Sequence, residues 1–594
     1  MADQDERVTM TRRAWLARAL AFQPRMSPAA LSLFLSVWFT LFYNQQFWRE
    51  VLASTSGTGP RGGVFLAALF VFVAAVMNFF LTLVAIRYVQ KAVAILLLFV
   101  GALAAFFMNS YGVLIDTTMI QNVIETDPAE VSEFLSLRLV LYVVALAVVP
   151  ALILLRTRIE DRPRTAVLRQ LAMSALASVV AVSLVGTLFY SDLVSLGNSR
   201  KGIGHRIAPA NVVVGTVNYL RRGFRVTPGV ARPLGRDAHR ASEAAGHDGK
   251  TVVVLVLGET VRSQEFALNG YSRATNPNLR RANVVSFDNV AACGTSTAVS
   301  VPCMFSNMRR ANYSARAAGA SEGLLDVLSH AGIRVLWRDN NSGCKGVCDR
   351  VESQDLALRK DKRLCSSGNC FDEILLDGLR ERLQSMDTDA FVVLHQKGSH
   401  GPTYYLRYPK EFERFKPACQ TSQLQECTVQ EVVNAYDNTV VYTDFFVSQV
   451  IALLRGLGDD YRTAMLFVSD HGESLGERNL YLHGLPYFVA PREQTQVPFV
   501  TWFSERFERA SGLDRQCLAS RRSEPFSHDN LFHSVLGLMD VQTSVYEEGL
   551  DAFAACRPDS SVVAAGGPAA EAGETSRSAP LEGEPGTDPS PAGG

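Results

Sequence analysis

Thr251-Val-Val-Val-Leu-Val-Leu-Gly-Glu259 is the stretch that decides the fold, because an unbroken apolar run ends on a single carboxylate. Runs of this kind are typical of strands that are buried on both faces of a parallel sheet. A second run, Thr463-Ala-Met-Leu-Phe-Val-Ser-Asp470-His471, follows the same plan and ends on an Asp-His pair. In open α/β sheets, ligands bind beyond the carboxyl ends of the strands. The two runs therefore predict one site that contains Glu259, Asp470 and His471.

A third stretch, Asn289–Phe305, supplies hydroxyl groups to this site. Thr295, Ser296 and Thr297 lie between two cysteines, and the small residues after them are expected to open a helix. A hydroxyl at a helix N-terminus faces unpaired N–H groups and the positive end of the dipole, which favours an alkoxide and a bound phosphate. The same sequence is also an ordinary N-cap. Together with a Glu, an Asp and a His, it predicts a metal site of the zinc type.

Five motifs occur in the order in which the lipid A phosphoethanolamine transferases carry them: Gly-Glu259-Thr-Val-Arg, Cys293-Gly-Thr-Ser-Thr297, Gly-Ser-His400-Gly-Pro, Ser-Asp470-His471-Gly-Glu and Tyr-Leu-His483-Gly. The chain resembles this family, which includes the EptA-type and the mobile colistin resistance enzymes, over nearly its whole length. The family belongs to the alkaline phosphatase superfamily. The resemblance therefore implies a zinc-dependent α/β/α domain that follows a helical membrane domain.

The resemblance also implies a role for each residue of the predicted metal site. Glu259, Asp470 and His471 would bind one zinc ion, and Thr297 would complete the site as the nucleophile. Lewis acidity at the metal would lower the pKa of the hydroxyl and stabilise phosphoryl charge. Thr295 and Ser296 are the competing nucleophiles, and the family pattern favours the last threonine.

Four further residues match family positions in the cleft, with more than one role open for each. His400 and His483 would bind a second zinc ion, hold the phosphate, or act as general acid and base. Asn341 and Lys345 match a segment near the substrate headgroup, where a lysine favours phosphate and an asparagine can bond a headgroup oxygen or amine. The alternative for these two is a surface loop pinned by a disulfide.

All ten cysteines lie between Cys293 and Cys556, outside the apolar N-terminal part of the chain. An even set confined to one half of a membrane protein suggests that this half is in an oxidising compartment. Spacing suggests four local pairs, and exclusion leaves a fifth: Cys293 with Cys303, Cys344 with Cys348, Cys365 with Cys370, Cys419 with Cys427, and Cys517 with Cys556. Reduced core cysteines or a cysteine metal site, most plausibly at Cys344 and Cys348, are the alternatives.

The first 190 residues contain apolar runs of the length that a bilayer requires. We predict five spans, at Ala29–Phe47, Val64–Ile86, Ala92–Val113, Leu139–Leu155 and Leu171–Tyr190. Basic residues gather before the first span and in the second-to-third and fourth-to-fifth connections, whereas the third-to-fourth connection is acidic. The positive-inside rule then places the N-terminus in the cytoplasm and the chain after the fifth span outside.

The rest of the chain divides by composition into three parts. Residues 191–248 form a linker with amphipathic pieces, notably Ile207–Phe224, which we interpret either as an interfacial segment or as a plain connector. Residues 249–556 alternate strands with helices, as expected for a doubly wound sheet. The predicted strands are Thr251–Leu257, Arg334–Trp337, Ala390–His395, Thr463–Ser469 and Val497–Thr501, and the predicted helices include Gly323–Ala331 and Val429–Leu457. The tail, residues 557–594, is expected to be disordered.

These observations lead to one expected function. The chain would be a monomeric enzyme of the bacterial inner membrane, with its catalytic domain in the periplasm. It would move phosphoethanolamine from phosphatidylethanolamine to a lipid A phosphate, which the resemblance links to polymyxin resistance. Lysine plus arginine and aspartate plus glutamate both number 58, so net charge gives no reason to expect a nucleic-acid partner. The alternatives are another acceptor, namely a lipopolysaccharide core sugar or a periplasmic glucan, or transfer of glycerophosphate. A hydrolase has less need of five spans.

Overall fold

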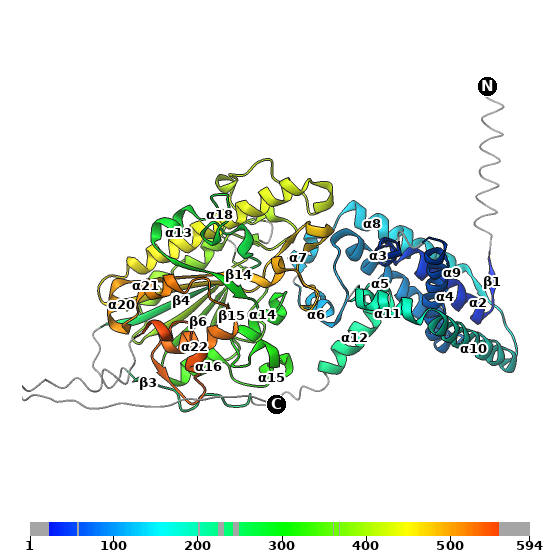
Figure 1. Cartoon of the computed structure of the whole chain (residues 1–594), viewed down its shortest axis with the longest axis horizontal. Helices are drawn as coiled ribbons and strands as arrows, with labels where there is room; N and C mark the ends of the chain where they lie inside the picture. Colours follow the sequence, from blue (N-terminus) through cyan, green and yellow to red (C-terminus); the bar gives the residue numbers. More distant parts are fainter. Residues whose placement is uncertain are drawn as a thin grey trace, which may run out of the picture.

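The computed structural model describes residues 23–55, 59–126, 128–199, 202–223, 231–241, 249–359, 361–366 and 369–557. Within these residues the chain forms a helical half, which ends with α12, and a half built on a central sheet (Figure 1). Residues 1–22, which hold most of the basic N-terminal segment, and the tail beyond Arg557 lie outside the described residues. The fold class predicted from the sequence, a helical membrane domain joined to an alkaline-phosphatase-like α/β/α domain, is confirmed.

The helical half contains long apolar helices and short helices that connect them. Its elements are α2 (Pro28–Phe42), α3 (Gln45–Thr55), α4 (Pro60–Leu83), α5 (Gln90–Tyr111), α6 (Thr117–Glu125), α7 (Pro128–Glu133), α8 (Leu137–Val143), a π-helical turn (Val144–Val148), α9 (Val149–Arg156), α10 (Arg164–Leu188), α11 (Tyr190–Ser199) and α12 (Ala210–Gly223). In the described part of the chain, four continuous helical segments are long and apolar enough to cross a membrane. They are Pro60–Leu83, Gln90–Tyr111, Leu137–Arg156 and Arg164–Leu188.

The first predicted span differs from the structure at its end. Its helix stops at Phe42 after 15 residues, because the Asn44 side chain donates to the carbonyls of Phe39 and Ala208, 2.8 and 3.0 Å away, and redirects the chain. The fourth span differs in its interior, where a π turn precedes Pro150. Proline lacks an N–H group and crowds the preceding turn, so a locally wider helix accommodates it.

The sheet has eight strands in the order β15-β5-β14-β11-β4-β10-β6-β7. They are β4 (Lys250–Gly258), β5 (Val285–Ala291), β6 (Arg334–Asp339), β7 (Glu352–Asp355), β10 (Ala390–His395), β11 (Tyr461–Ser469), β14 (Gln496–Phe503) and β15 (Phe526–Ser527). β4 lies at the centre, parallel to both β10 and β11. All five predicted strands are present, but β14 is antiparallel to β11 and β5, so the sheet is mixed.

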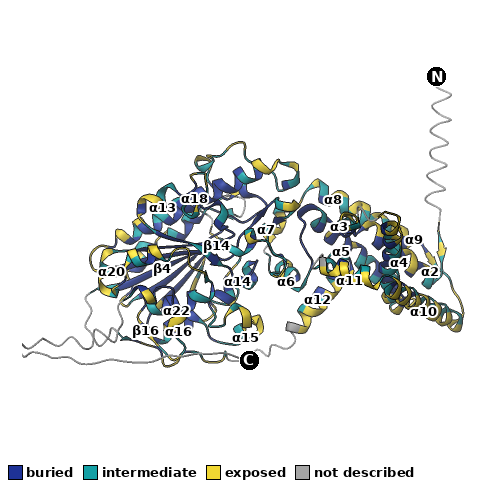
Figure 2. Cartoon of the chain, viewed as in Figure 1, coloured by how far each residue is buried: buried dark blue, intermediate teal, exposed yellow. Residues whose placement is uncertain are grey.

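Alternate residues of β4 face two different helical layers, which makes the domain three layers deep (Figure 2). Val252, Val254 and Val256 pack with α13 (Pro277–Ala282), α17 (Leu379–Gln384) and α18 (Val429–Arg455). The intervening Val253, Leu255 and Leu257 pack with α14, α16, α20, α21 and α22 on the other face. These helices are α14 (Thr297–Met304), α16 (Leu324–His330), α20 (Glu505–Ser511), α21 (Arg515–Ser520) and α22 (Asp529–Leu538), with α15 (Ala315–Gly319) and α19 (Arg492–Thr495) at the margin.

The two halves share one continuous apolar core on the α18 side of the sheet. The contact extends to polar groups, since the Tyr111 hydroxyl at the end of α5 donates to the Ser422 carbonyl at 3.2 Å. The short helices α6 and α7 lie between the membrane helices and the sheet (Figure 1). Residues 231–241 join the sheet-containing half, where β3 (His239–Arg240) pairs with β16 (Val541–Gln542).

Candidate active site at the carboxyl edge of the sheet

Glu259, Asp470 and His471 meet because their strands are parallel neighbours in register. Ser469, the last residue of β11, pairs with Gly258, the last residue of β4, so both chains leave the sheet at the same level. The ligand atoms of the three side chains all lie within 4.8 Å of one another, and each residue is fully buried. Two adjacent strand ends therefore deliver the two carboxylates and the imidazole that the sequence predicts together.

The atoms of this cluster fit a bound cation. His471 Nδ1 lies 2.9 Å from the Gly472 carbonyl, which fixes the tautomer and leaves Nε2 to face Asp470 Oδ2 at 3.3 Å. Asp470 Oδ1 accepts from the backbone N–H groups of Thr260 and His471, but Oδ2 has no hydrogen-bond partner among the described residues. A buried carboxylate oxygen with no hydrogen-bond partner, beside an imidazole Nε2, is the arrangement that a metal ion satisfies.

Burial and neighbouring charges shift the pKa of each of these three groups. Burial, followed by repulsion from Glu259, raises the pKa of Asp470 well above its usual range. Burial also acts to raise the pKa of Glu259, but attraction from His471, His400 and His483 outweighs it and lowers that pKa. Burial lowers the pKa of His471 to about 4, so its imidazole is neutral and available as a ligand. A dication would allow both carboxylates to be ionised.

Of the three candidate hydroxyls, Thr297 is the one that lies against the cluster. Its Oγ1 donates to Glu259 Oε2 at 3.1 Å and lies 3.5 Å from His471 Nε2. Thr297 is the first residue of α14, with Ser296 as the N-cap residue. Thr295 Oγ1 instead donates to the Leu485 carbonyl at 2.6 Å. The competing threonine is thus committed to the scaffold, whereas Thr297 faces the predicted metal position.

His400 and His483 lie together at the mouth of the cluster, with ring centroids 5.2 Å apart. His483 Nδ1 lies 3.3 Å from Glu473 Oε2. Although burial alone lowers the pKa of His483, the Glu473 carboxylate outweighs it and raises that pKa to about 9. Burial lowers the pKa of His400 well below its usual value. The two imidazoles therefore have different protonation states, which suits an acid and a base or two different contacts to phosphate.

Asn341 contacts a residue of the metal cluster, whereas Lys345 lines the hollow beside it. Asn341 Nδ2 donates to Glu259 Oε2 at 2.7 Å and to the Gln396 carbonyl at 2.9 Å, so its amide orients the carboxylate. Lys345 Nζ donates to the carbonyl and hydroxyl oxygens of Ser342, both at 3.0 Å. Lys345 lines the hollow that also contains Thr297, where its ammonium can approach a phosphate.

The helical half supplies one wall of this hollow, which sequence reasoning missed. Asn122, Glu125, Thr126 and Glu130, from α6 and α7, line it opposite Thr297, His400 and His483. Glu130 Oε1 lies 3.2 Å from His400 Nε2. The sequence indicates this wall only through the acidic residues between the third and fourth predicted spans. In the sequence analysis those charges serve only to predict the orientation of the chain in the membrane.

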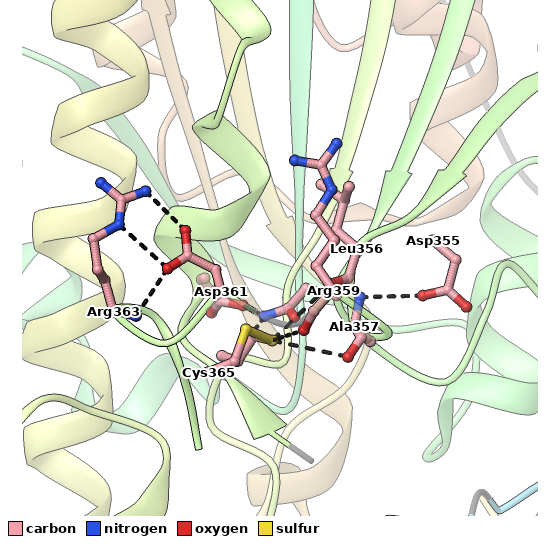
Figure 3. The surroundings of a disulfide bond; sticks show 10 residues. Asp355, Leu356, Ala357, Arg359, Asp361, Arg363 and Cys365 are labelled. Atoms are coloured by element: carbon pink, nitrogen blue, oxygen red, sulfur yellow. Dashed lines mark hydrogen bonds and ion pairs between the residues drawn. A yellow bond between two sulfur atoms is a disulfide. The ribbon is translucent and has the colours of Figure 1, made fainter. Parts of the chain in front are cut away.

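The ten cysteines form five disulfides: Cys293–Cys303, Cys344–Cys348, Cys365–Cys370, Cys419–Cys427 and Cys517–Cys556. The sulfurs at positions 344 and 348 are bonded to each other, so they are not held apart as metal ligands. Figure 3 shows the surroundings of the Cys365–Cys370 bridge, where Arg363 pairs with Asp361 at 2.7 Å. This bridge closes the strand pair β8 (Cys365–Ser366) and β9 (Asn369–Cys370).

Comparison with known proteins gives the same organisation. The family model described as Sulfatase matches residues 251–541, and the one described as Phosphoethanolamine transferase EptA/EptB matches residues 73–224. Phosphoethanolamine transferase EptA of Escherichia coli K12 is 39% identical over 91% of this chain and 99% of its own. Phosphatidylethanolamine transferase Mcr-1 of Escherichia coli is 34% identical over 88% of this chain and 96% of its own.

A solved structure resembles both halves at once. It is the integral membrane protein lipooligosaccharide phosphoethanolamine transferase A (EptA) from Neisseria meningitidis, with a TM-score of 0.87 and 37% identity. The match covers 90% of this chain and 100% of that one. The motifs, the two-part fold and these full-length similarities lead to one conclusion: the chain belongs to the EptA and Mcr family of phosphoethanolamine transferases.

Proposed function

We propose that this phosphoethanolamine transferase takes its group from phosphatidylethanolamine and passes it to a phosphate of lipid A. The observation that carries the proposal is the position of Thr297 Oγ1, 3.1 Å from Glu259 Oε2 and 3.5 Å from His471 Nε2, at the start of a helix. A hydroxyl in this place can be deprotonated and attack phosphorus. The name of Mcr-1, a phosphatidylethanolamine transferase, supports the choice of donor. The name of the Neisseria meningitidis enzyme, a lipooligosaccharide phosphoethanolamine transferase, supports an acceptor of the lipid A class.

Transfer proceeds in two displacements. Thr297 Oγ attacks the donor phosphorus, the bond from phosphorus to the diacylglycerol oxygen breaks, and that oxygen takes up a proton. An oxygen of the acceptor phosphate then attacks the phosphoethanolamine-threonine, and Thr297 regains its proton. We assign the proton transfers to His400 and His483, which line the same hollow as Thr297. Binding of a second zinc ion or of the phosphate is the alternative role for these two residues.

The chain's own groups arrange the site for this chemistry. A zinc ion held by Glu259, Asp470, His471 and Thr297 would lower the pKa of the threonine hydroxyl and stabilise charge on the phosphoryl oxygens. Asn341 orients Glu259, and Lys345 offers a cation to the phosphate. The N-terminus of α14 adds backbone N–H groups and the positive end of its dipole.

The proposed location follows from the lipid substrates. The N-terminal transmembrane domain, residues 1–190, anchors the enzyme in the inner membrane with its N-terminus in the cytoplasm, and the catalytic domain, residues 249–556, lies in the periplasm. Residues 191–248 link the two parts and 557–594 form the tail. Anchoring keeps the site at the surface that contains both donor and acceptor, which raises their effective concentration. The product carries an added ammonium, which weakens attraction for cationic peptides such as polymyxin.

The test is to separate loading from discharge. The full-length protein, incubated with phosphatidylethanolamine and no acceptor, should release diacylglycerol and carry phosphoethanolamine on Thr297, which peptide mass spectrometry detects. Lipid A should then discharge the loaded enzyme faster than water, a core oligosaccharide or a periplasmic glucan does. Modification of Thr295 or Ser296 would correct the nucleophile, and faster discharge by another acceptor would replace lipid A. Discharge by water as fast as by any acceptor would make the protein a hydrolase and overturn the proposal.

A further inference from the structure

A buried polar node joins the two halves beside the His400 loop. Glu133, the last residue of α7, accepts hydrogen bonds from Arg407 and Thr403 through Oε2, and from Asn369 Nδ2 at 3.3 Å through Oε1. The side chains of Arg407 and Glu133 are 1% and 5% exposed. Asn369 Oδ1 also accepts from Arg407 at 3.4 Å, which closes the network. An ion pair this deeply buried is well held only when its remaining donors and acceptors are satisfied, as they are here.

Arg407 transmits this contact to the active site. Its Nε donates to the backbone carbonyl of His400 at 2.8 Å while its terminal nitrogen binds Glu133. The imidazole of His400 is held separately, by Glu130 from the same short helix. One helix of the membrane half therefore contacts both the ring and, through Arg407, the backbone of His400.

We infer that Glu133 is a positioning residue for catalysis: through Arg407 it fixes the His400 loop against Thr297, so that the active site is complete only when the membrane half is docked. The inference rests on the proposed role of His400 in the transferase reaction. Glu133 itself is shielded from the hollow that contains Thr297 and is not among its lining residues. Its effect must therefore pass through Arg407 rather than through contact with substrate.

The chain offers a matched control in the same interface. Tyr111 also crosses between the halves, where its hydroxyl donates to the Ser422 carbonyl at 3.2 Å and accepts from Gln423 at 3.4 Å. It is linked to neither His400 nor Arg407 by any described hydrogen bond. Tyr111→Phe thus removes an interdomain hydrogen bond without touching the loop, whereas Glu133→Gln keeps the shape of the node and removes its charge.

The experiment compares full-length, zinc-loaded Glu133→Gln, Arg407→Lys and Tyr111→Phe enzymes in detergent. We expect Glu133→Gln and Arg407→Lys each to slow the loading of Thr297 about 10–100-fold, the range typical when an outer partner of a metal-site residue is lost. The loss should fall on the maximal rate rather than on the half-saturating donor concentration. The two node variants should lose stability, because each alters one partner of a buried ion pair, so loading rates are compared per folded protein. Zinc content per folded protein should stay near wild type, the double variant should be no slower than the worse single one, and Tyr111→Phe should load at the wild-type rate.

Two results would overturn the inference. One is equal slowing by Tyr111→Phe, which would mean that any weakening of the interface suffices. The other is slowing of the Glu133 and Arg407 variants only in proportion to lost zinc or lost folded protein. If Thr297 of the wild-type enzyme does not become loaded with phosphoethanolamine, the proposed function fails. Amide hydrogen exchange over residues 396–408 then tests by itself whether Glu133 holds the His400 loop. Faster exchange there in Glu133→Gln than in Tyr111→Phe supports it, and unchanged exchange refutes it.

Discussion

Buried carboxylates of the catalytic half differ between those that only support the fold and those of the candidate active site. In the scaffold, Asp372 accepts four hydrogen bonds, shared between its two oxygens. Asp444 on α18 accepts from the backbone N–H groups of Asn278 and Leu279, both at 2.9 Å, at the start of α13. At the site, by contrast, Asp470 Oδ2 and Glu473 Oε1 have no hydrogen-bond partner among the described residues.

The number of bonded carboxylate oxygens distinguishes acids that stabilise the fold from acids that are available for catalysis or metal binding. A buried acid whose oxygens are bonded stabilises the structure around it, and its loss leaves donors unsatisfied. A buried acid with an empty oxygen costs free energy until a ligand arrives. Changes at the site should therefore reduce activity more than stability, and changes in the scaffold should do the opposite.

The largest effect is expected from Thr297→Ala. The only proposed covalent carrier is lost, so the transfer rate should fall by about 10⁴-fold or more, as when other enzymes lose their nucleophile. The unfolding free energy should change by about 1 kcal/mol at most, since the hydroxyl contributes little beyond one hydrogen bond. Product formation by mass spectrometry and thermal melting measure the two. A large fall in melting temperature would break the distinction between site and scaffold.

The paired variants Asp470→Asn and Asp444→Asn test the comparison within one residue type. Asp470→Asn should lose bound zinc and reduce activity about 1,000-fold, because one of the few proposed metal ligands is removed, with little loss of stability relative to the zinc-free wild type. Asp444→Asn should keep zinc but lose about 1–3 kcal/mol, because an amide cannot accept from both N–H groups as well as a carboxylate does. Metal analysis and thermal melting distinguish them. Loss of zinc from both variants would contradict the assignment of Asp470 to the metal site and of Asp444 to the scaffold.

The disulfides test how much the scaffold contributes to stability, because the loops that they close differ in length. In the chain-entropy account, the Cys517–Cys556 bridge, which spans 39 residues, should contribute about 4 kcal/mol, and the Cys365–Cys370 bridge, which spans 5, about 2 kcal/mol. Serine pairs at these positions should lower the melting temperature in that order. Both variants should retain zinc. Equal melting temperatures for the two would show that bridge position, and not loop length, sets the contribution.

Asp437 provides a pH-dependent test, because only one of its two carboxylate oxygens has a described hydrogen-bond partner. Its Oδ2 accepts from Tyr271 and Arg273, but Oδ1 has no described partner, and burial raises the pKa to about 7 from 3.8. A raised carboxyl pKa favours folding when the group is protonated, so this stability is full below about pH 4 and is lost as the pH rises through 7. Between pH 5 and pH 8 the wild type should lose about 2.5 kcal/mol relative to Asp437→Asn. A difference in unfolding free energy between the wild type and Asp437→Asn that does not change with pH would contradict the raised pKa of Asp437.

Sequence alone predicted the parts of this site that local pattern determines. The runs ending at Glu259 and Asp470 mark buried strands, and the parallel register of β4 and β11 follows from the fold class. It did not predict β5, whose Phe-Asp-Asn interior breaks the apolar run, or the antiparallel direction of β14. Strand direction depends on which connections cross the sheet, and no single segment encodes that.

The contribution of the membrane half to the active site could not be predicted from the sequence, for a different reason. Glu130 and His400 are 270 residues apart in the sequence, and their contact at 3.2 Å depends on how the two halves of the chain pack together. An acidic loop outside a membrane has an ordinary explanation in charge asymmetry. Without docking information, no pattern distinguishes an acid that orients the chain from one that lines an active site.

The shared wall of the hollow has a consequence for inhibitor discovery. A compound selected against the soluble part alone meets Thr297, Lys345 and His483 on an open surface, without α6 and α7 opposite them. A compound that places a cation near Glu130 and an anion near Lys345 needs both halves in order to bind. Screens with the full-length protein in lipid should therefore yield chemical series that screens with the excised domain rank as inactive.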